Sequence, residues 1–354
     1  MRPAATTPFE SAPEAALSRL SEAAVSAALV DIQAHGLELI ASAALRERGM
    51  HVAPALTAAE RVTAMTILLT PAVLTEIRNA CDGRILLMKG PEVAAHYPDA
   101  ALRGYNDLDL LVDDADAAHK AMLRAGFRPV GNPKLFEGIH HLRPVALFGG
   151  ALPVEVHSRP KWVTFSDAPD FGTLAREAVP SATSIAGIEA PSPAHHVLLL
   201  AVHSWAHEPL RRLRDLLDIA VLAPACAAGE IDEWAAAFGV ERIWSATKTA
   251  LATLCHGTRL PMPISLWARN IERCRERTVL EDHLERWLSG FASQSPLAAT
   301  RGLKQPLRQT FAPDYESASQ KLRRSYHAVR NAHARRSEHV ASVETLLPPP
   351  FGER

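Results

Sequence analysis

One hexapeptide constrains the fold more than any other part of the chain: Asp107-Leu108-Asp109-Leu110-Leu111-Val112. Its apolar residues predict a buried strand, and side chains two positions apart on a strand point to the same face. Leu108 and Leu110 should therefore enter a core, while Asp107 and Asp109 share the opposite face. Two adjacent carboxylates repel each other, and a divalent cation that prefers hard oxygen ligands, such as Mg²⁺, relieves the repulsion. An Asp-x-Asp pair is common without a metal, so its neighbours must support this interpretation.

A second acidic strand is predicted at Val154-Glu155-Val156-His157. The valines take one face, so Glu155 and His157 project together from the other. If this strand neighbours the first, Glu155 completes a set of three carboxylates. Such a set can hold two metal ions about 3.5–4 Å apart and stabilise both the attacking and the leaving oxygen in phosphoryl transfer. His157 either contacts a carboxylate or substrate, or is an ordinary strand-end histidine.

Two further motifs precede the acidic pair. Lys89-Gly90 follows the apolar run 85–88, which predicts a buried strand, and precedes a short helix at 92–97 with Pro91 in its first turn. A lysine and backbone N–H groups at such a junction can contact phosphate, although the G-x-x-x-x-G-K-[ST] pattern of a P-loop is absent. Arg103 lies four residues before Asp107, close enough to bring a guanidinium to the same site.

The chain as a whole predicts an α+β fold in which a small mixed sheet is flanked by helices. Its 354 residues favour more than one domain or a core with a large helical annex. We expect an N-terminal helical segment at 1–80, an α/β core at 81–190, a C-terminal helical domain at 191–340 and a flexible tail at 341–354. Within the core, 113–125 reads as a helix ended by Gly126, and Gly149-Gly150 predicts a hairpin between runs 141–148 and 152–157.

Helical periodicity defines the flanking parts. The stretch 11–48 is Ala/Leu-rich with helical spacing, and a second helix is expected to begin at Thr57, where Thr57-x-x-Glu60 fits a capping box, and to break near Pro71. Further helices are predicted at 194–207, 210–222, 231–238, 243–256, 266–289 and 317–333.

Charge, cysteines and hydropathy argue against several classes of protein. The formal net charge of -1 gives no overall electrostatic sign of a nucleic-acid or anionic-membrane partner, although a neutral total can contain a local basic patch, so tRNA is not favoured but stays open. Its four cysteines are widely spaced and form no CxxC pair, which argues against a zinc ribbon or a disulfide framework. No signal peptide and no apolar run of transmembrane length is recognised, so a cytoplasmic location without membrane association is expected.

Other polar groups have competing interpretations. Arg211, Arg212 and Arg214, beside Asp215 and Asp218, form either a salt-bridged helix face or a wall that turns an arginine such as Arg214 toward a nucleotide. The remaining groups are His203 and His207, Arg159 and Lys161, and the basic stretches 321–324 and 330–336. The histidines have a spacing that could bind a transition metal, but interhelical hydrogen bonds or the lining of a cleft are favoured. The cations are expected to be solvated rather than bound to phosphate, RNA or an acidic partner.

The order of these motifs resembles the nucleotidyltransferase superfamily of the DNA polymerase β type. The residues that carry the likeness are Leu87-Met88-Lys89-Gly90, Tyr97-Pro98, Arg103, the strand 107–112, Gly126-Phe127, 153–157 and the segment 213–219. More narrowly, the chain is similar to a bacterial uncharacterised nucleotidyltransferase family in which Lys-Gly replaces the usual Gly-Ser pair, and more distantly to AbiEii-type toxin nucleotidyltransferases. The likeness covers roughly residues 80–225.

The resemblance implies a division of roles within the site. Asp107 and Asp109 would be metal ligands, Glu155 the third carboxylate, and Lys89-Gly90 the turn that binds the triphosphate. The serine of the Gly-Ser pair is missing, so phosphate contact would depend on Lys89, Arg103 and backbone groups.

We therefore expect Mg²⁺-dependent transfer of a nucleoside monophosphate from an NTP to a hydroxyl, with release of pyrophosphate. Glu155 is the candidate to accept the proton of the nucleophile. The acceptor is open among a small molecule, a peptide, a protein and a tRNA. The alternatives are a toxin-like enzyme that modifies tRNA and a catalytically silent module that binds nucleotide.

Overall fold

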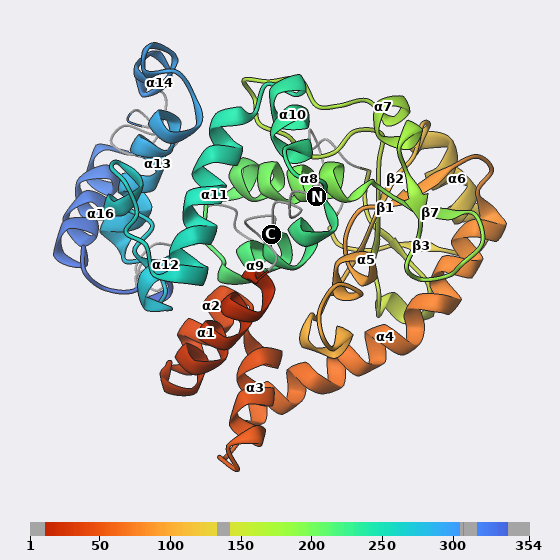
Figure 1. The fold of residues 1–354 in the computed structure, drawn as a ribbon, viewed down its shortest axis with the longest axis horizontal. Helices are drawn as coiled ribbons and strands as arrows, with labels where there is room; N and C mark the ends of the chain where they lie inside the picture. Colours follow the sequence, from red (N-terminus) through yellow and green to blue (C-terminus); the bar gives the residue numbers. More distant parts are fainter. Residues whose placement is uncertain (1–10, 133–141, 305–306, 308–316, 339–354) are drawn as a thin grey trace, which may run out of the picture.

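The computed structural model describes residues 11–132, 142–304, 307 and 317–338 and has the α+β fold expected from the sequence (Figure 1). A mixed sheet occupies one side of the molecule, and helices from both ends of the chain make up the other. The expected tail at 341–354 lies outside the described residues. The proposed boundaries at 80 and 190 stay predictions.

The sheet has seven strands in the order β3-β4-β5-β2-β1-β7-β6. Their bounds are β1 Ile85–Leu87, β2 Leu108–Leu111, β3 Arg128–Pro129, β4 Val145–Ala146, β5 Val154–His157, β6 Val179–Pro180 and β7 Ile188–Ala190. At the centre, β2 is antiparallel to β1 and parallel to β5. The strand β4 pairs antiparallel with β5 across the 3-10 turn Phe148–Gly150, so the hairpin expected at Gly149-Gly150 is confirmed.

Helices cover both faces of the sheet. Leu108 and Leu110 pack in one apolar cluster with residues of α4 (Pro54–Ala80) and α6 (Ala115–Arg124). Leu86 and Leu111 point the other way, into a cluster with Leu174 of α7 (Phe171–Arg176) and with α8 (Pro193–His207). Because side chains alternate along a strand, Asp109 shares the face of Leu111 and is directed toward α8.

The first three helices pack on the C-terminal ones, whereas α4 packs on the sheet. The helices α1 (Ala12–Ser26), α2 (Leu29–His35) and α3 (Glu38–Glu47) share a hydrophobic core with α8, α9 (Leu213–Leu222) and α11 (Glu241–His256). Within that core, α1 contacts both α9 and α11. The remaining elements are α5 (Pro91–Ala94), η1 (Ala100–Leu102), η4 (Ala223–Ala225), α10 (Glu230–Ala237), η5 (Ile264–Leu266), α12 (Asn270–Arg273), α13 (Val279–Ser293), α14 (Pro296–Gly302) and α16 (Ala318–Arg330).

The expected start and break of α4 are wrong. The helix begins at Pro54, a residue suited to the first helical turn, so Thr57 lies inside it and forms no cap. Glu60 instead binds Ser42 and Arg46 of α3. Pro71 lies within the continuous helix, whose following turns bury apolar side chains against the sheet. That packing outweighs the hydrogen bond that proline removes.

The single helix expected at 266–289 is also wrong. The short helix α12 ends at Cys274, which has φ +45°, and α13 begins only after Thr278. Thr278 and Glu281 form a reciprocal capping box, a Thr-x-x-Glu signal that is present in the sequence. Apolar residues at helical spacing continue across the segment between α12 and α13, so the sequence pattern did not reveal the break.

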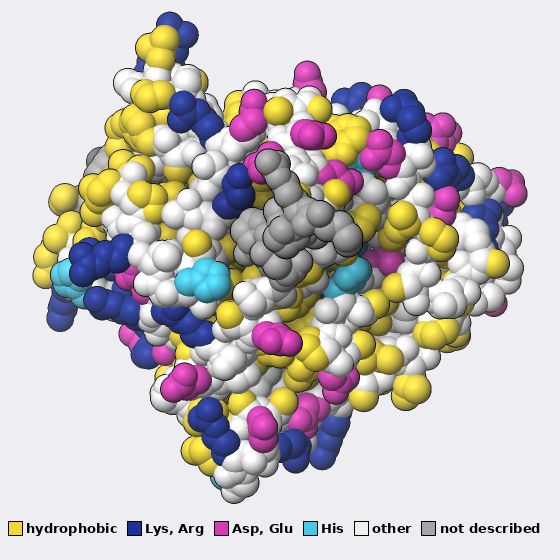
Figure 2. Space-filling view, viewed as in Figure 1, with side chains coloured by type: hydrophobic (Ala, Val, Ile, Leu, Met, Phe, Trp, Pro, Cys, Tyr) yellow, Lys and Arg dark blue, Asp and Glu magenta, His cyan; other side chains and the backbone are white. Residues whose placement is uncertain are grey.

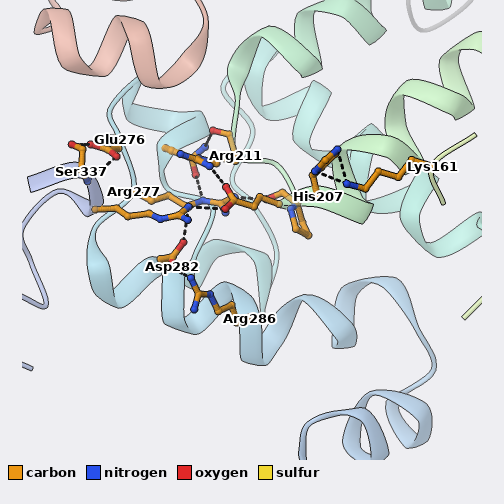
Figure 3. A network of polar contacts seen from close by, with 12 residues as sticks. Lys161, His207, Arg211, Glu276, Arg277, Asp282, Arg286 and Ser337 are labelled. Carbon is orange, nitrogen blue, oxygen red and sulfur yellow. Dashed lines mark hydrogen bonds and ion pairs between the residues drawn. The ribbon is translucent and has the colours of Figure 1, made fainter. Parts of the chain in front are cut away.

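A C-terminal strap, defined as residues 331–338, fastens the helical half together. Backbone bonds join Val279 N to Ala334 O at 3.1 Å and Arg336 N to Arg277 O at 3.1 Å. The Arg335 guanidinium binds Asp31 of α2, and Arg336 binds Glu208 after α8 at 2.8 Å. Figure 3 shows part of this network, including the contact between Ser337 and Glu276.

The surface in the view of Figure 2 mixes acidic and basic side chains instead of gathering one sign, in line with the net charge of -1. Within the described residues, no helix combines the length and apolar character needed to cross a bilayer.

Candidate active site

A polar pocket of about 490 Å³ lies where the ends of β1 and β2 face α8 and α9. The sheet side contributes Lys89, Asp107 and Asp109. The helical side contributes mostly basic groups, namely His203, His207, Arg211, Arg212 and Arg214, together with Glu208, Asp215 and Asp218. Predicted site residues from four separate segments thus line one cavity.

The two acidic strands are neighbours, as their alternation suggested. In the parallel pair of β2 and β5, Asp109 lies opposite Glu155 and Leu111 opposite His157. His157 Nε2 is 3.4 Å from Asp109 Oδ1 and 3.6 Å from Glu155 Oε2. One ligand atom from each of these three side chains lies within 4.8 Å of the others, a spacing at which they could share one metal ion.

Burial and charge oppose each other at Asp109. The side chain is 5 % exposed, and burial alone would raise its pKa, but the Lys89 ammonium and His157 hold the pKa well below its usual value. Burial would lower the pKa of His157, yet its contacts with Asp109 and Glu155 raise it. The carboxylate at the centre of the site is therefore ionised at neutral pH.

Asp107 occupies the more open rim of the same pocket. Loss of hydration against the pocket wall raises its pKa, and the negative charge of Asp109 raises it further. This repulsion between the two aspartates is what a bound cation would relieve.

The Lys89-Gly90 turn lies between β1 and α5, as expected. Met88 N donates to Asp109 O at 2.9 Å, which extends the β1–β2 pairing up to the turn, and the Lys89 Nζ is 3.6 Å from Asp109 Oδ2. Gly90 has φ +65° and ψ -119°, a conformation that side chains disfavour. On the other side, the buried ring of His196 contacts Met88 O at 2.5 Å and fixes α8 to the same turn.

Arg103 lines the pocket, but its guanidinium is engaged by a buried carboxylate. Its NH2 and Nε groups donate to the two oxygens of Asp218 at 2.9 and 3.3 Å, and Tyr97 OH donates to Asp218 Oδ1 at 2.6 Å. The pair joins the sheet half to α9 across 115 positions of sequence. This partner was not anticipated, and contact between Arg103 and phosphate stays a prediction.

The arginines near α9 differ in their partners, so some fit a salt-bridged helix face and others a wall of the pocket. Arg211 forms an ion pair with Glu208, whereas Arg212 is exposed at the pocket. Arg214 also lines the pocket, and its NH1 lies 3.4 Å from Gly104 O. Binding of nucleotide by Arg214 remains a prediction.

The histidines His203 and His207 of α8 contact two lysines, and both histidines line the pocket. His203 contacts the Lys89 ammonium at 3.0 Å, and His207 contacts the Lys161 ammonium at 2.7 Å. Lys161 is partly exposed and has a histidine partner that was not expected, and its role toward phosphate stays a prediction. The spacing of His203 and His207 was the available signal, but nothing local pointed to their lysine partners.

Comparison with protein families places the chain in the broad class of nucleotidyltransferase families. The model that matches is described as "Uncharacterised nucleotidyltransferase" and covers residues 21–255, so the chain belongs to this family. Comparisons with curated proteins and with solved structures gave no significant match. The match spans the sheet and the pocket and ends before α12, leaving α12–α16 and the strap beyond it.

Proposed function

We propose that the chain catalyses Mg²⁺-dependent transfer of a nucleoside monophosphate from an NTP to an acceptor hydroxyl, with release of pyrophosphate. The observation that carries the proposal is the pairing of Asp109 with Glu155 across two parallel strands. Asp109 and Asp107 both line the pocket, and Glu155 is the strand neighbour of Asp109. Membership of the nucleotidyltransferase family supports the proposal.

The residues present fit a divalent metal. Asp109 and Glu155 offer carboxylate oxygens, the donors that Mg²⁺ prefers. Burial and then the charge of Asp109 raise the pKa of Asp107, and a cation would neutralise the second of these causes. Asp107, Asp109 and Glu155 would hold the metal. Because three carboxylates can bind two ions, we propose a second metal ion at the same site. Bound there, the metal would supply charge stabilisation for the phosphates.

The protein's own groups then have distinct tasks. Lys89 binds and orients the phosphates at the turn after β1, and the basic wall of α8 and α9 balances their charge. Glu155, which is partly exposed, accepts the proton of the attacking hydroxyl. His157 holds Asp109 and Glu155 at a fixed separation through its contacts with both.

The acceptor can be found by incubating the protein with labelled NTPs and a cell extract and identifying the species that becomes labelled. Labelled tRNA would favour the toxin-like alternative. Nucleotide binding that needs no metal, with no pyrophosphate released from any NTP across acceptors, would favour the silent module and overturn the proposal.

Asp109→Asn should lower transfer at least about 1,000-fold, because it removes a ligand from a metal that supplies several kcal/mol of transition-state stabilisation. Asp113→Asn is the matched control, since Asp113 is exposed just beyond the same strand. Pyrophosphate release by both variants, with circular dichroism to verify folding, makes the measurement. Unchanged turnover in Asp109→Asn would remove the metal-site assignment.

A further inference from the structure

Two lysine–histidine pairs lie on successive turns of α8 and form what we call the Lys-His ladder: Lys89, His203, His207 and Lys161. Lys89 Nζ lies 3.2 and 3.0 Å from the two ring nitrogens of His203, and Lys161 Nζ lies 2.7 and 2.8 Å from those of His207. The two imidazole rings are 4.5 Å apart. Figure 3 shows Lys161 extending toward His207 from outside the helix.

The ladder carries two positive charges and little compensation. An ammonium group has only donors, so each imidazole must be neutral to accept from its lysine. Burial, and after it the charge of Lys161, lower the pKa of His207 to about 4, in agreement with that requirement. Asp109 partly balances Lys89 at 3.6 Å. The charge of Glu155 attracts Lys161, but among the described residues no carboxylate lies close enough to Lys161 to form an ion pair.

The Lys161 ammonium lies near the Lys89 ammonium, so the excess of positive charge is concentrated in one place. Burial and then the charge of Lys89 lower the pKa of Lys161, so the two ammonium groups are close enough to repel each other. A chain gains nothing in stability from holding two cations together in a half-buried setting, whereas a bound polyanion would neutralise both. The ladder also begins at Lys89, beside the carboxylates, and leads away from them along α8.

We propose that the Lys-His ladder binds the polyphosphate tail of the nucleotide, with Lys89 nearer the reacting phosphorus and Lys161, held by His207, at the distal phosphates. This inference rests on the proposed function and assigns the outer part of its phosphate site. It also supplies the phosphate contacts that the missing serine of the Gly-Ser pair leaves open.

Isothermal titration with inorganic tripolyphosphate, in EDTA, tests the ladder without any transfer. Lys161→Met should weaken tripolyphosphate binding by about 10-fold or more, the scale of a lost hydrogen bond to a charged group. Lys161→Arg should retain most of the affinity. Lys248→Met is the matched control, because the Lys248 ammonium is already balanced by an ion pair with Asp232. ATP should follow tripolyphosphate across these variants, and AMP should bind equally to all of them.

The outcomes separate this inference from the proposed function. Normal tripolyphosphate binding by Lys161→Met would overturn the ladder, whatever Asp109→Asn does to transfer. An equal loss of AMP binding would also overturn it, because the lysine would then serve the nucleoside monophosphate. A selective loss of tripolyphosphate and ATP binding would support the ladder even if the wild-type protein transferred no nucleotide.

Discussion

Two buried aspartates of the same pocket differ in how completely their charges are satisfied. Asp218 is 3 % exposed and Asp109 is 5 % exposed. Asp218 accepts hydrogen bonds from Arg103 at 2.9 Å and from Tyr97 at 2.6 Å. The cationic contacts of Asp109, to Lys89 at 3.6 Å and to His157 at 3.4 Å, are longer than ordinary hydrogen bonds.

The difference separates a structural carboxylate from one with capacity left for a ligand. Asp218 joins β-sheet and helical halves through a fully enclosed ion pair. Asp109 faces two other carboxylates, and the mutual repulsion appears in the raised pKa of Asp107. A carboxylate that is buried, ionised and loosely coordinated is suited to a cation that arrives with the substrate.

The largest expected contrast is in folding stability. Asp218→Asn should lower the free energy of unfolding by about 3–5 kcal/mol, because it leaves the Arg103 guanidinium buried without its counter-charge. Asp109→Asn should cost less than half as much, since it loses longer contacts and also relieves repulsion. Urea denaturation of both variants measures the difference. The double variant Arg103→Met/Asp218→Leu removes both charges and should recover part of the stability lost in Asp218→Asn. Equal losses of stability in Asp218→Asn and Asp109→Asn would contradict the comparison.

The next contrast is in the response to metal. Saturation with Mg²⁺ or Mn²⁺ should raise the free energy of unfolding of the wild type by about 2.7 kcal/mol at a hundred times the dissociation constant. Asp218→Asn should show a similar increment above its lower baseline, whereas Asp109→Asn should show almost none. Thermal unfolding with and without EDTA records this. A full increment in Asp109→Asn would mean that the metal binds elsewhere.

The smallest contrast concerns acid. Burial alone would raise the pKa of Asp218, but Arg103 and Tyr97 hold it below the ordinary value of 3.8. A carboxyl group with a lowered folded-state pKa contributes stability above its unfolded pKa and loses that contribution as the pH falls. The stability gap between wild type and Asp218→Asn should therefore narrow below about pH 4. Denaturation curves at neutral and acid pH test this, and a gap that widened in acid would contradict it.

The parts of the site that follow local periodicity could be predicted from the sequence. The two-residue repeat of a strand placed Asp109 and Glu155 opposite the apolar side chains of their strands, and apolar runs located β1, β2 and β5. That the strands are neighbours was an expectation from chemistry, since isolated carboxylates would have no reason to alternate with core valines. The register of β2 and β5 confirms it.

The parts that depend on distant partners could not be predicted. Arg103 was read from its distance to Asp107 along the chain, yet its partner Asp218 is 115 residues away. Lys161 resembled an ordinary loop cation because its partner His207 lies 46 positions away, on a helix that the fold brings beside it. The break expected at Pro71 failed for the opposite reason. Proline is a strong local signal for a helix break, but the packing of α4 against the sheet keeps the helix continuous.

The C-terminal strap has a consequence for how this family should be dissected. Asp31 and Glu208 lie inside the region that defines the family, but Asp31 is bound by Arg335 and by Glu276 N, and Glu208 by Arg336. A fragment cut at residue 255 would keep every carboxylate of the pocket, yet it would remove Arg335 from Asp31 and leave Glu208 with Arg211 as its remaining arginine partner. The smallest piece worth expressing is therefore set by these ion pairs and extends through the strap, well beyond the boundary of sequence similarity.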